Sequence, residues 1–233
     1  MDELNIKYSN KYKVVSFDLF LTLVNVNEKI DEIWNEVLPY TCSKEQALAY
    51  ANELFKEYST IMKDEMMKDE FISMRNIFEK CSASMISKTQ LPIEPNSLVE
   101  ALIKAHYNAP VYKEVAEVLN YLKKKYRLII SSDSDCEMCN NALLLYGIDR
   151  MYTSEELQTY KSNPKRNFFA GIIEQLNVNP DEIVHIGDSR SDLIAAYKSS
   201  IDFIWINREN RNPMQFSKAS FIIQNLKELE NIL

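Results

Sequence analysis

Short apolar runs alternate with amphipathic segments over the second half of the chain. The runs 128–132, 183–186 and 203–206 are mainly apolar and rich in β-branched residues, a pattern typical of buried parallel strands. A shorter run over 221–223 is a weaker candidate of the same kind. The segments between and after these runs carry apolar residues at helical spacing and predict helices over 113–126, 137–145, 167–176, 193–198 and 226–233.

The first strand candidate, 14–17, is separated from the others by a long helical stretch. Apolar positions recur at helical spacing from about residue 28 to residue 106, and no strand-like run interrupts them. The prolines at 92 and 95 punctuate the stretch before its last helix. The pattern predicts helices beginning near Ile30 and over 47–58, 65–78 and 97–106.

Strands that alternate with helices favour an α/β fold with a doubly wound parallel sheet. We therefore expect a core built from residues 1–24 and 109–233. An all-helical cap, residues 25–108, would be inserted directly after the first strand. A chain of 233 residues is long enough for such a core with one insertion.

The net charge of −7 argues against a general nucleic-acid or anionic-membrane surface. No apolar stretch approaches membrane-spanning length, and residues 1–5 do not resemble a signal peptide, so we expect a cytoplasmic protein. Cys136 and Cys139 form a lone CxxC pair, more typical of two thiols on a helix than of a zinc site. Three glycines are too few for a glycine-rich phosphate loop.

Two aspartates follow apolar strands, Asp18 after 14–17 and Asp188 after 183–186 and Gly187. Ligands of open α/β sheets bind beyond the carboxyl ends of the strands, so both carboxylates are expected in one crevice. A carboxylate in this setting is costly unless it is paired or metal-bound. Such a pair can hold a hard divalent cation, and one member can attack an electrophile.

Other polar residues near the expected crevice allow two interpretations each. Thr22 can cap the next segment or contact a bound anion, and Ser132 with Asp133 can cap a helix or bind an anion at its N-terminus. Lys161 is either a solvated surface charge or the cation that neutralises a substrate anion. Asp192 lies in a helical first turn, where the helix dipole alone favours an acid.

Four motifs in this order resemble those of the haloacid dehalogenase superfamily of hydrolases. They are the segment 17–23, Ser132 after the run 128–130, Lys161, and the segment 187–192. The resemblance implies a Rossmann-like core with a helical cap after the first motif. It also implies that Asp18 is a nucleophile that forms a covalent intermediate, that Ser132 binds the transferred group, and that Lys161 steadies both Asp18 and the substrate.

By the same resemblance, Mg²⁺ would be held by Asp18, Asp188 and the main-chain carbonyl of Phe20, with Asp192 bracing the arrangement. Such a site suits phosphoryl transfer, which depends on positioned positive charge. We therefore expect a Mg²⁺-dependent phosphatase that acts on a small phosphorylated metabolite, with no nucleic-acid or membrane partner.

One departure from the phosphatase pattern keeps two alternatives open. The phosphatases of this superfamily carry a second aspartate two residues after the nucleophile, where this chain has Phe20. The metal-independent 2-haloacid dehalogenases also lack that acid, but their fourth motif is not usually of the type Gly187–Asp188. They also place an arginine early in the cap, and here none precedes Arg75. The two alternatives to a phosphatase are therefore a metal-independent 2-haloacid dehalogenase and a catalytically weakened protein that binds a ligand or a partner.

Overall fold

Six parallel strands form the central sheet of the protein. The computed structural model describes residues 11–233, so the expectations for the first ten residues, including that for a signal peptide, lie outside the described residues. The strand order is β3-β2-β1-β4-β5-β6. This confirms the expected α/β fold with a parallel sheet. The strands are β1 (Val14–Phe17), β2 (Arg127–Ser132), β3 (Arg150–Thr153), β4 (Ile183–Gly187), β5 (Asp202–Ile206) and β6 (Phe221–Ile223).

The register of the central strands brings three chain segments to one edge of the sheet. Phe17 pairs with Ile130 of β2 on one side and with Ile186 of β4 on the other. The backbone N–H of Asp18 then donates to the carbonyl of Ile186 at 2.8 Å. Residues that follow these three strands therefore share one carboxyl edge, as the position of ligand sites in open α/β sheets requires.

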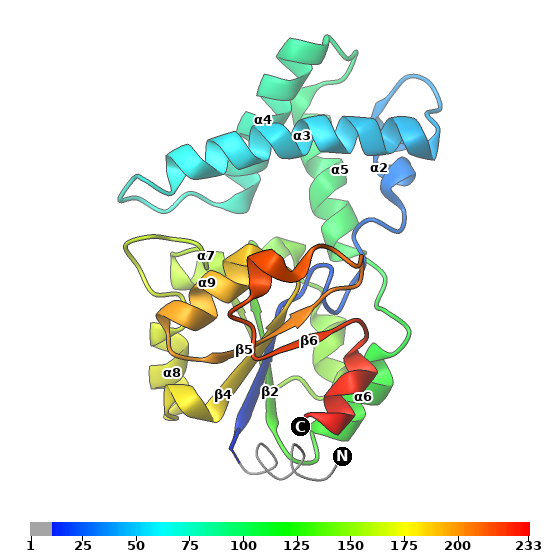
Figure 1. The fold of residues 1–233 in the computed structure, drawn as a ribbon. Coiled ribbons are helices and arrows are strands. Elements are labelled where there is room, and N and C mark those ends of the chain that lie inside the picture. Colours follow the sequence, from blue (N-terminus) through cyan, green and yellow to red (C-terminus); the bar gives the residue numbers. More distant parts are fainter. Residues whose placement is uncertain (1–10) are drawn as a thin grey trace. The chain divides into compact units, whose positions relative to one another are not determined.

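Helices cover both faces of the sheet (Figure 1). On one face, α8 and α9 contribute Ile172, Leu193 and Ala196 to a buried apolar cluster with residues of the strands. On the other face lies α6, whose Val115, Val118, Leu119 and Leu122 are buried. The helices of this unit are α6 (Val115–Leu122), α7 (Ser154–Leu157), α8 (Ala170–Leu176) and α9 (Arg190–Lys198), with 3₁₀ turns at Asn141–Tyr146, Pro180–Glu182, Pro213–Phe216 and Leu226–Asn231.

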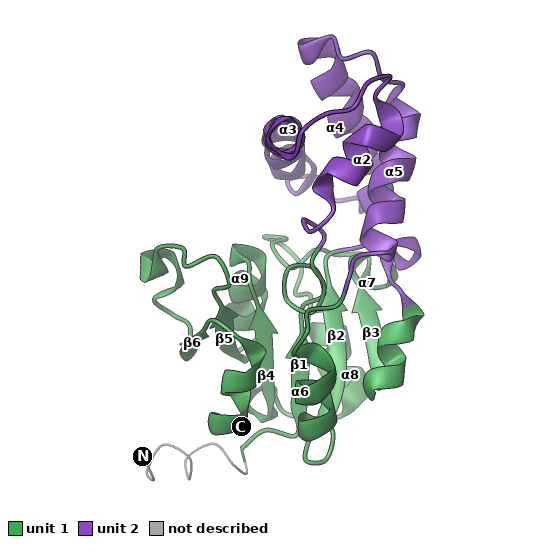
Figure 2. Ribbon diagram, turned by 90° about the vertical axis from the view of Figure 1, so that its right-hand side faces the viewer, with its two compact units in different colours: residues 1–25, 111–133, 141–233 green, residues 26–110, 134–140 purple. Residues whose placement is uncertain are grey.

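The chain divides into two compact units, drawn in two colours in Figure 2. The first holds the sheet and comprises, of the described residues, 11–25, 111–133 and 141–233. The second comprises 26–110 and 134–140 and is helical in all its regular elements. Among the described helices of both units, none is long and apolar enough to cross a membrane. The second unit contains α2 (Ile30–Val37), α3 (Lys44–Glu65), α4 (Met74–Thr89), α5 (Pro95–Tyr107) and a 3₁₀ turn at Cys136–Met138.

The segment 134–140 belongs with the helices, although the sequence pattern placed it in the core. The Asp135 carboxylate accepts hydrogen bonds from the backbone N–H groups of Met74 and Arg75, both at 2.8 Å. It therefore caps the N-terminus of α4 from a distant part of the chain. The Arg75 guanidinium also pairs with Glu137, so two contacts fix this segment to α4.

Several sequence predictions of secondary structure were wrong. The predicted helix 226–233 is a 3₁₀ turn over Leu226–Asn231. The predicted helix 65–78 is interrupted, because Ser73 caps a new helix by accepting from the backbone of Asn76. The predicted helix 137–145 is replaced by two 3₁₀ turns on either side of Cys139. The strand β3 was missed because it is an edge strand of four residues, of which only Tyr152 and Thr153 are buried.

Gly187 lets the first turn of α9 approach the end of β4. A Cβ atom at this position would lie 2.3 Å from Cγ of Asp192 and 2.7 Å from its Cβ. We predict that Gly187→Ala lowers the free energy of unfolding by about 1–3 kcal/mol, as overpacking does. Urea unfolding measures the change. The control is Gly171→Ala in α8, where the nearest atom in the way is 3.9 Å distant. Equal stability of the two variants would contradict the prediction.

Candidate active site

Asp18 lies at the end of β1, in a loop that holds its side chain largely away from water. It is only 8% exposed. The loop turns back sharply, since the backbone N–H groups of Leu23 and Val24 both donate to the carbonyl of Leu19. Leu21 adopts a left-handed conformation with φ of 60°. Such backbone in a bulky residue is strained by on the order of 1–3 kcal/mol and concentrates at functional sites.

Lys161 provides the buried positive charge at this edge of the sheet. Its side chain is 1% exposed, and its Nζ donates to Oδ1 of Asp18 at 2.6 Å and to Oδ1 of Asp192 at 2.5 Å. Burial acts to lower the pKa of Lys161, but Asp18, Asp192 and Asp133 outweigh it and hold the pKa above its ordinary value. The lysine is therefore an ammonium ion at neutral pH and not a solvated surface charge.

Asp133 positions the main chain of Lys161. Its Oδ1 accepts from the backbone N–H of Lys161 at 2.8 Å. Burial raises the pKa of Asp133 to about 6. Among the described contacts, this carboxylate supports the lysine loop, whereas the sequence pattern suggested an anion-binding position.

Asp192 is held at both oxygens by the first turn of α9 and by the sheet. Oδ2 accepts from the backbone N–H of Ser189 at 3.0 Å and from its hydroxyl, while Oδ1 lies 3.0 Å from Nε2 of His185 and also accepts from Lys161. Burial acts to raise the pKa of Asp192, but Lys161 and His185 outweigh it and keep the pKa below its ordinary value. Asp192 is therefore a permanent anion that shares the lysine with Asp18.

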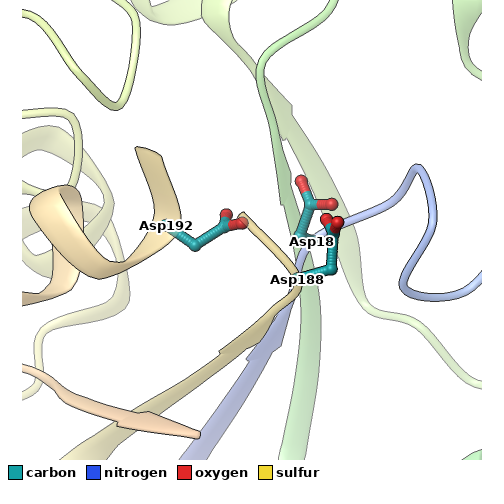
Figure 3. A group of neighbouring side chains, drawn as sticks. All are labelled: Asp18, Asp188 and Asp192. Atoms are coloured by element: carbon teal, nitrogen blue, oxygen red, sulfur yellow. The ribbon is translucent and has the colours of Figure 1, made fainter. Parts of the chain in front are cut away.

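Asp188 follows β4 and lies beside Asp18. Ligand oxygens of Asp18, Asp188 and Asp192 all lie within 4.8 Å of one another, which is close enough for a metal ion. Figure 3 shows the Asp18 and Asp188 carboxylates next to each other, with Asp192 extending toward them from α9. Burial and then the Asp192 carboxylate raise the pKa of Asp188 to about 7, although Arg211 acts in the opposite direction.

Two buried hydroxyls at the site have no hydrogen-bond partner among the described residues. They are Oγ1 of Thr22 and Oγ of Ser132, on side chains that are 0% and 1% exposed. Buried polar groups are normally paired, so each hydroxyl can accept or donate one bond to a bound molecule. This favours the anion-contact interpretation of both residues over helix capping.

Three residues near the site were not predicted from the sequence: His185, Arg208 and Arg211. Arg211 donates to the carbonyl of Asp188 at 2.6 Å and contacts its Oδ2 at 3.3 Å. Arg208 donates to the carbonyl of Thr22 at 2.8 Å. Both arginines follow β5, so the same rule that selected Asp18 and Asp188 would have found them. His185 lies within an apolar strand. The sequence shows there only a polar residue in a buried run, which does not indicate its partners.

The fold and the site together define a class of hydrolase in which a carboxylate follows the first strand of a parallel α/β sheet. Residues 12–198 match the family model described as haloacid dehalogenase-like hydrolase. This match covers most of the chain, so the protein belongs to the haloacid dehalogenase-like hydrolase family.

Similar proteins include dehalogenases. (S)-2-haloacid dehalogenase 4A of Burkholderia cepacia is 30% identical over 142 residues, which are 58% of this chain and 61% of that protein, less than two thirds of its length. L-2-haloacid dehalogenase from Xanthobacter autotrophicus aligns with a TM-score of 0.77 at 15% identity, over 94% of this chain and 96% of that chain. The HAD-hydrolase YfnB from Bacillus subtilis, solved bound to magnesium, aligns with a TM-score of 0.73 at 12% identity, over 96% and 99%. The two structural similarities show the fold alone.

The raised pKa of Asp188 has a consequence for stability. The folded-state value of about 7 exceeds the ordinary value of 3.8, so the folded protein binds a proton between these pH values that the unfolded chain releases. The contribution of this group is therefore lost as the pH rises toward 7. We predict that the free energy of unfolding of Asp188→Asn, relative to that of wild type, increases by about 1–2 kcal/mol from pH 5 to pH 8.

Urea unfolding at the two pH values measures this gain. The matched control is Asp181→Asn, because Asp181 is an exposed aspartate of the same unit. Asp188→Asn also removes the ion pair with Arg211. Because the Arg211 side chain is 41% exposed, the loss of this ion pair costs little stability. A stability difference that does not change with pH would contradict the prediction.

Proposed function

We propose that the protein hydrolyses the carbon–halogen bond of a 2-haloacid, with Asp18 as the nucleophile and without a metal ion. The observation that carries this proposal is Phe20, which stands where a proton-donating acid would serve a phosphatase. An alkoxide leaving group needs a proton, and a general acid contributes about 10²–10⁴ in rate. A halide leaves as a stable anion and needs none. The dehalogenase names of similar proteins support the same choice.

The residues at the site fit the two chemical steps. In the first, a carboxylate oxygen of Asp18 forms a C–O bond with the carbon that bears the halogen, the C–X bond breaks, and the halide leaves with its electron pair. In the second, water attacks the Asp18 carbonyl carbon of the resulting ester. The 2-hydroxy acid and one proton are released, and the carboxylate is restored. Lys161 holds Oδ1 of Asp18 at 2.6 Å, which leaves the other oxygen for the attack.

The ammonium group and the two unpartnered hydroxyls suit a carboxylate substrate. Lys161 offsets the negative charge of Asp18 and of the incoming anion, which would otherwise repel each other. The hydroxyls of Thr22 and Ser132 are buried and without partners among the described residues, so each can donate to a substrate carboxylate. Charge-assisted hydrogen bonds of this kind are stronger than neutral ones.

We predict that the wild-type protein releases halide from an (S)-2-haloacid in the presence of EDTA and that Asp18→Asn does not. The substitution keeps the size of the side chain but removes the nucleophile. Chloride release from 2-chloropropionate, with circular dichroism as a fold control, measures the effect. The matched control Asp181→Asn should keep the wild-type rate. Equal halide release by Asp18→Asn and wild type would remove Asp18 from the mechanism.

A second candidate function, a Mg²⁺-dependent phosphatase, is favoured by one observation. Oxygens of Asp18 and Asp188 lie within 4.8 Å of each other, and these carboxylates with the Phe20 carbonyl would suit a hard divalent cation. Both oxygens of Asp192 are already engaged, so it would brace the site rather than ligate. The cation would supply Lewis-acid stabilisation of a phosphoryl group. Arg211 competes for the same carboxylate, since it contacts Oδ2 of Asp188.

Titration calorimetry with Mg²⁺ separates the two candidates. For the metal-independent hydrolase we predict that wild type binds Mg²⁺ weakly, with Kd above about 1 mM. We also predict that Arg211→Ala binds it at least several-fold more tightly, because the competing guanidinium is gone. The double variant Arg211→Ala/Asp188→Ala is the control and should lose this gain. Tight binding by wild type, together with Mg²⁺-dependent hydrolysis of an aryl phosphate, would favour the phosphatase.

A further inference from the structure

A row of buried polar side chains crosses the centre of the sheet and ends at Asp192. Oγ of Ser16 in β1 lies 2.9 Å from Oγ of Ser131 in β2 and 2.9 Å from Nδ1 of His185 in β4. Nε2 of His185 lies 3.0 Å from Oδ1 of Asp192. All four side chains belong to residues that are 0% exposed. Polar groups in the middle of a sheet carry a desolvation cost, so this row needs an explanation beyond packing.

The surroundings of His185 favour the neutral ring. The imidazole packs edge-on against Phe169, with ring centroids 5.1 Å apart, and near Phe203 at 6.1 Å. Burial lowers the pKa of His185, with the Lys161 ammonium acting in the same direction, although Asp192 opposes both. A carboxylate oxygen can only accept, so the ring proton belongs on Nε2. Nδ1 lies 2.9 Å from Oγ of Ser16, whose hydroxyl donates to Ser131.

We propose that His185 is a positioning residue that keeps the Lys161 ammonium on Asp18 by satisfying Asp192. This inference rests on the proposed function of Asp18 as the nucleophile. His185 does not contact the substrate in this proposal; it acts through Asp192.

Two carboxylates compete for one lysine. Nζ of Lys161 donates to Oδ1 of Asp18 at 2.6 Å and to Oδ1 of Asp192 at 2.5 Å. Oδ1 of Asp192 receives a second bond from His185, and this bond lowers the demand of that oxygen for the ammonium. Without the imidazole N–H, Asp192 would draw Lys161 toward itself and away from Asp18. The nucleophile would then lose its partner, although no residue that touches it had changed.

The Asp192 carboxylate fixes the tautomer of His185. Because its Oδ1 lies 3.0 Å from Nε2 and can only accept, the ring proton stays on Nε2 and faces Asp192. Removal of the outer partners of metal ligands typically lowers metal affinity or activity by about 10- to 100-fold, and we expect a loss of the same order from the removal of the His185 donor. Buried polar networks of this kind also act as units, so substitutions within them are not additive.

Two substitutions separate positioning from mere stability. His185→Leu removes the donor to Asp192, and His185→Gln places an amide N–H near the position of Nε2. The matched control is Ile204→Val in β5, which is equally buried and lies outside the polar row. We expect His185→Leu to lower kcat about 10- to 100-fold with KM changed less than about threefold. His185→Gln should recover most of kcat, and Ile204→Val should keep it.

A measurement without substrate separates this inference from the proposed function. In a ¹H–¹⁵N spectrum, a buried ammonium held by carboxylates gives a slowly exchanging signal, and we expect this signal from Lys161 in wild type and in His185→Gln. We expect it to be lost or shifted in His185→Leu, while Ile204→Val retains it. If wild type turns over no 2-haloacid, the proposed function fails, and the Lys161 signal still decides the role of His185.

Two results would overturn the proposal. One is a His185→Leu protein that folds and shows the wild-type Lys161 signal, because the ammonium then needs no help from the imidazole. The other is an equal loss in His185→Leu and His185→Gln, which would show that the ring is required for packing alone. If His185→Leu does not fold, His185→Phe, which keeps a planar ring but has no donor, replaces it. This variant should lower kcat in the same sense, and an unchanged kcat would count against the proposal.

Discussion

One buried ammonium group determines the arrangement of the site. Three carboxylates lie within one small region, and the Lys161 ammonium opposes the protonation that their repulsion and desolvation favour. Even with it, burial raises the pKa of Asp18 well above its ordinary value and that of Asp188 to about 7. The lysine bonds directly to two of the three carboxylates, and the backbone of the same residue is held by a fourth acid, Asp133. Its position is therefore fixed at both ends, which a flexible surface lysine could not match.

The parallel sheet makes this convergence possible. Asp18, Ser132 and Asp188 come from parts of the chain more than 50 residues apart, yet the pairing of β1 with β2 and β4 brings their strands to a common end. Arg211 reaches the same edge after β5. The same scaffold can serve different chemistry by exchanging single residues at these ends, and Phe20 is such a residue.

Much of the fold could be predicted from the sequence, and part of the site. Short β-branched runs identified five of the six strands, because such a run between helical segments is typical of a buried parallel strand. The edge strand β3 had no such signal. Asp18, Lys161 and Asp188 were expected together, and the structure brings them together; their roles stay predictions. Arg211 could have been placed at this edge by the same rule, but the contacts of His185 could not be predicted, because they depend on register and on side-chain direction across neighbouring strands.

The cap that Asp135 provides to α4 limits how the helical unit can be exchanged. A chimaera that replaced residues 26–110 with the corresponding segment of a relative would retain Asp135 but change the helix it serves. Unless the new segment begins a helix at the same place, the carboxylate, 2% exposed, would lose the two backbone N–H groups that it now accepts from, at a cost of about 1–3 kcal/mol or more. Recombination of this protein with its relatives therefore has to transfer two separate stretches of sequence, and the short one begins one residue after Asp133.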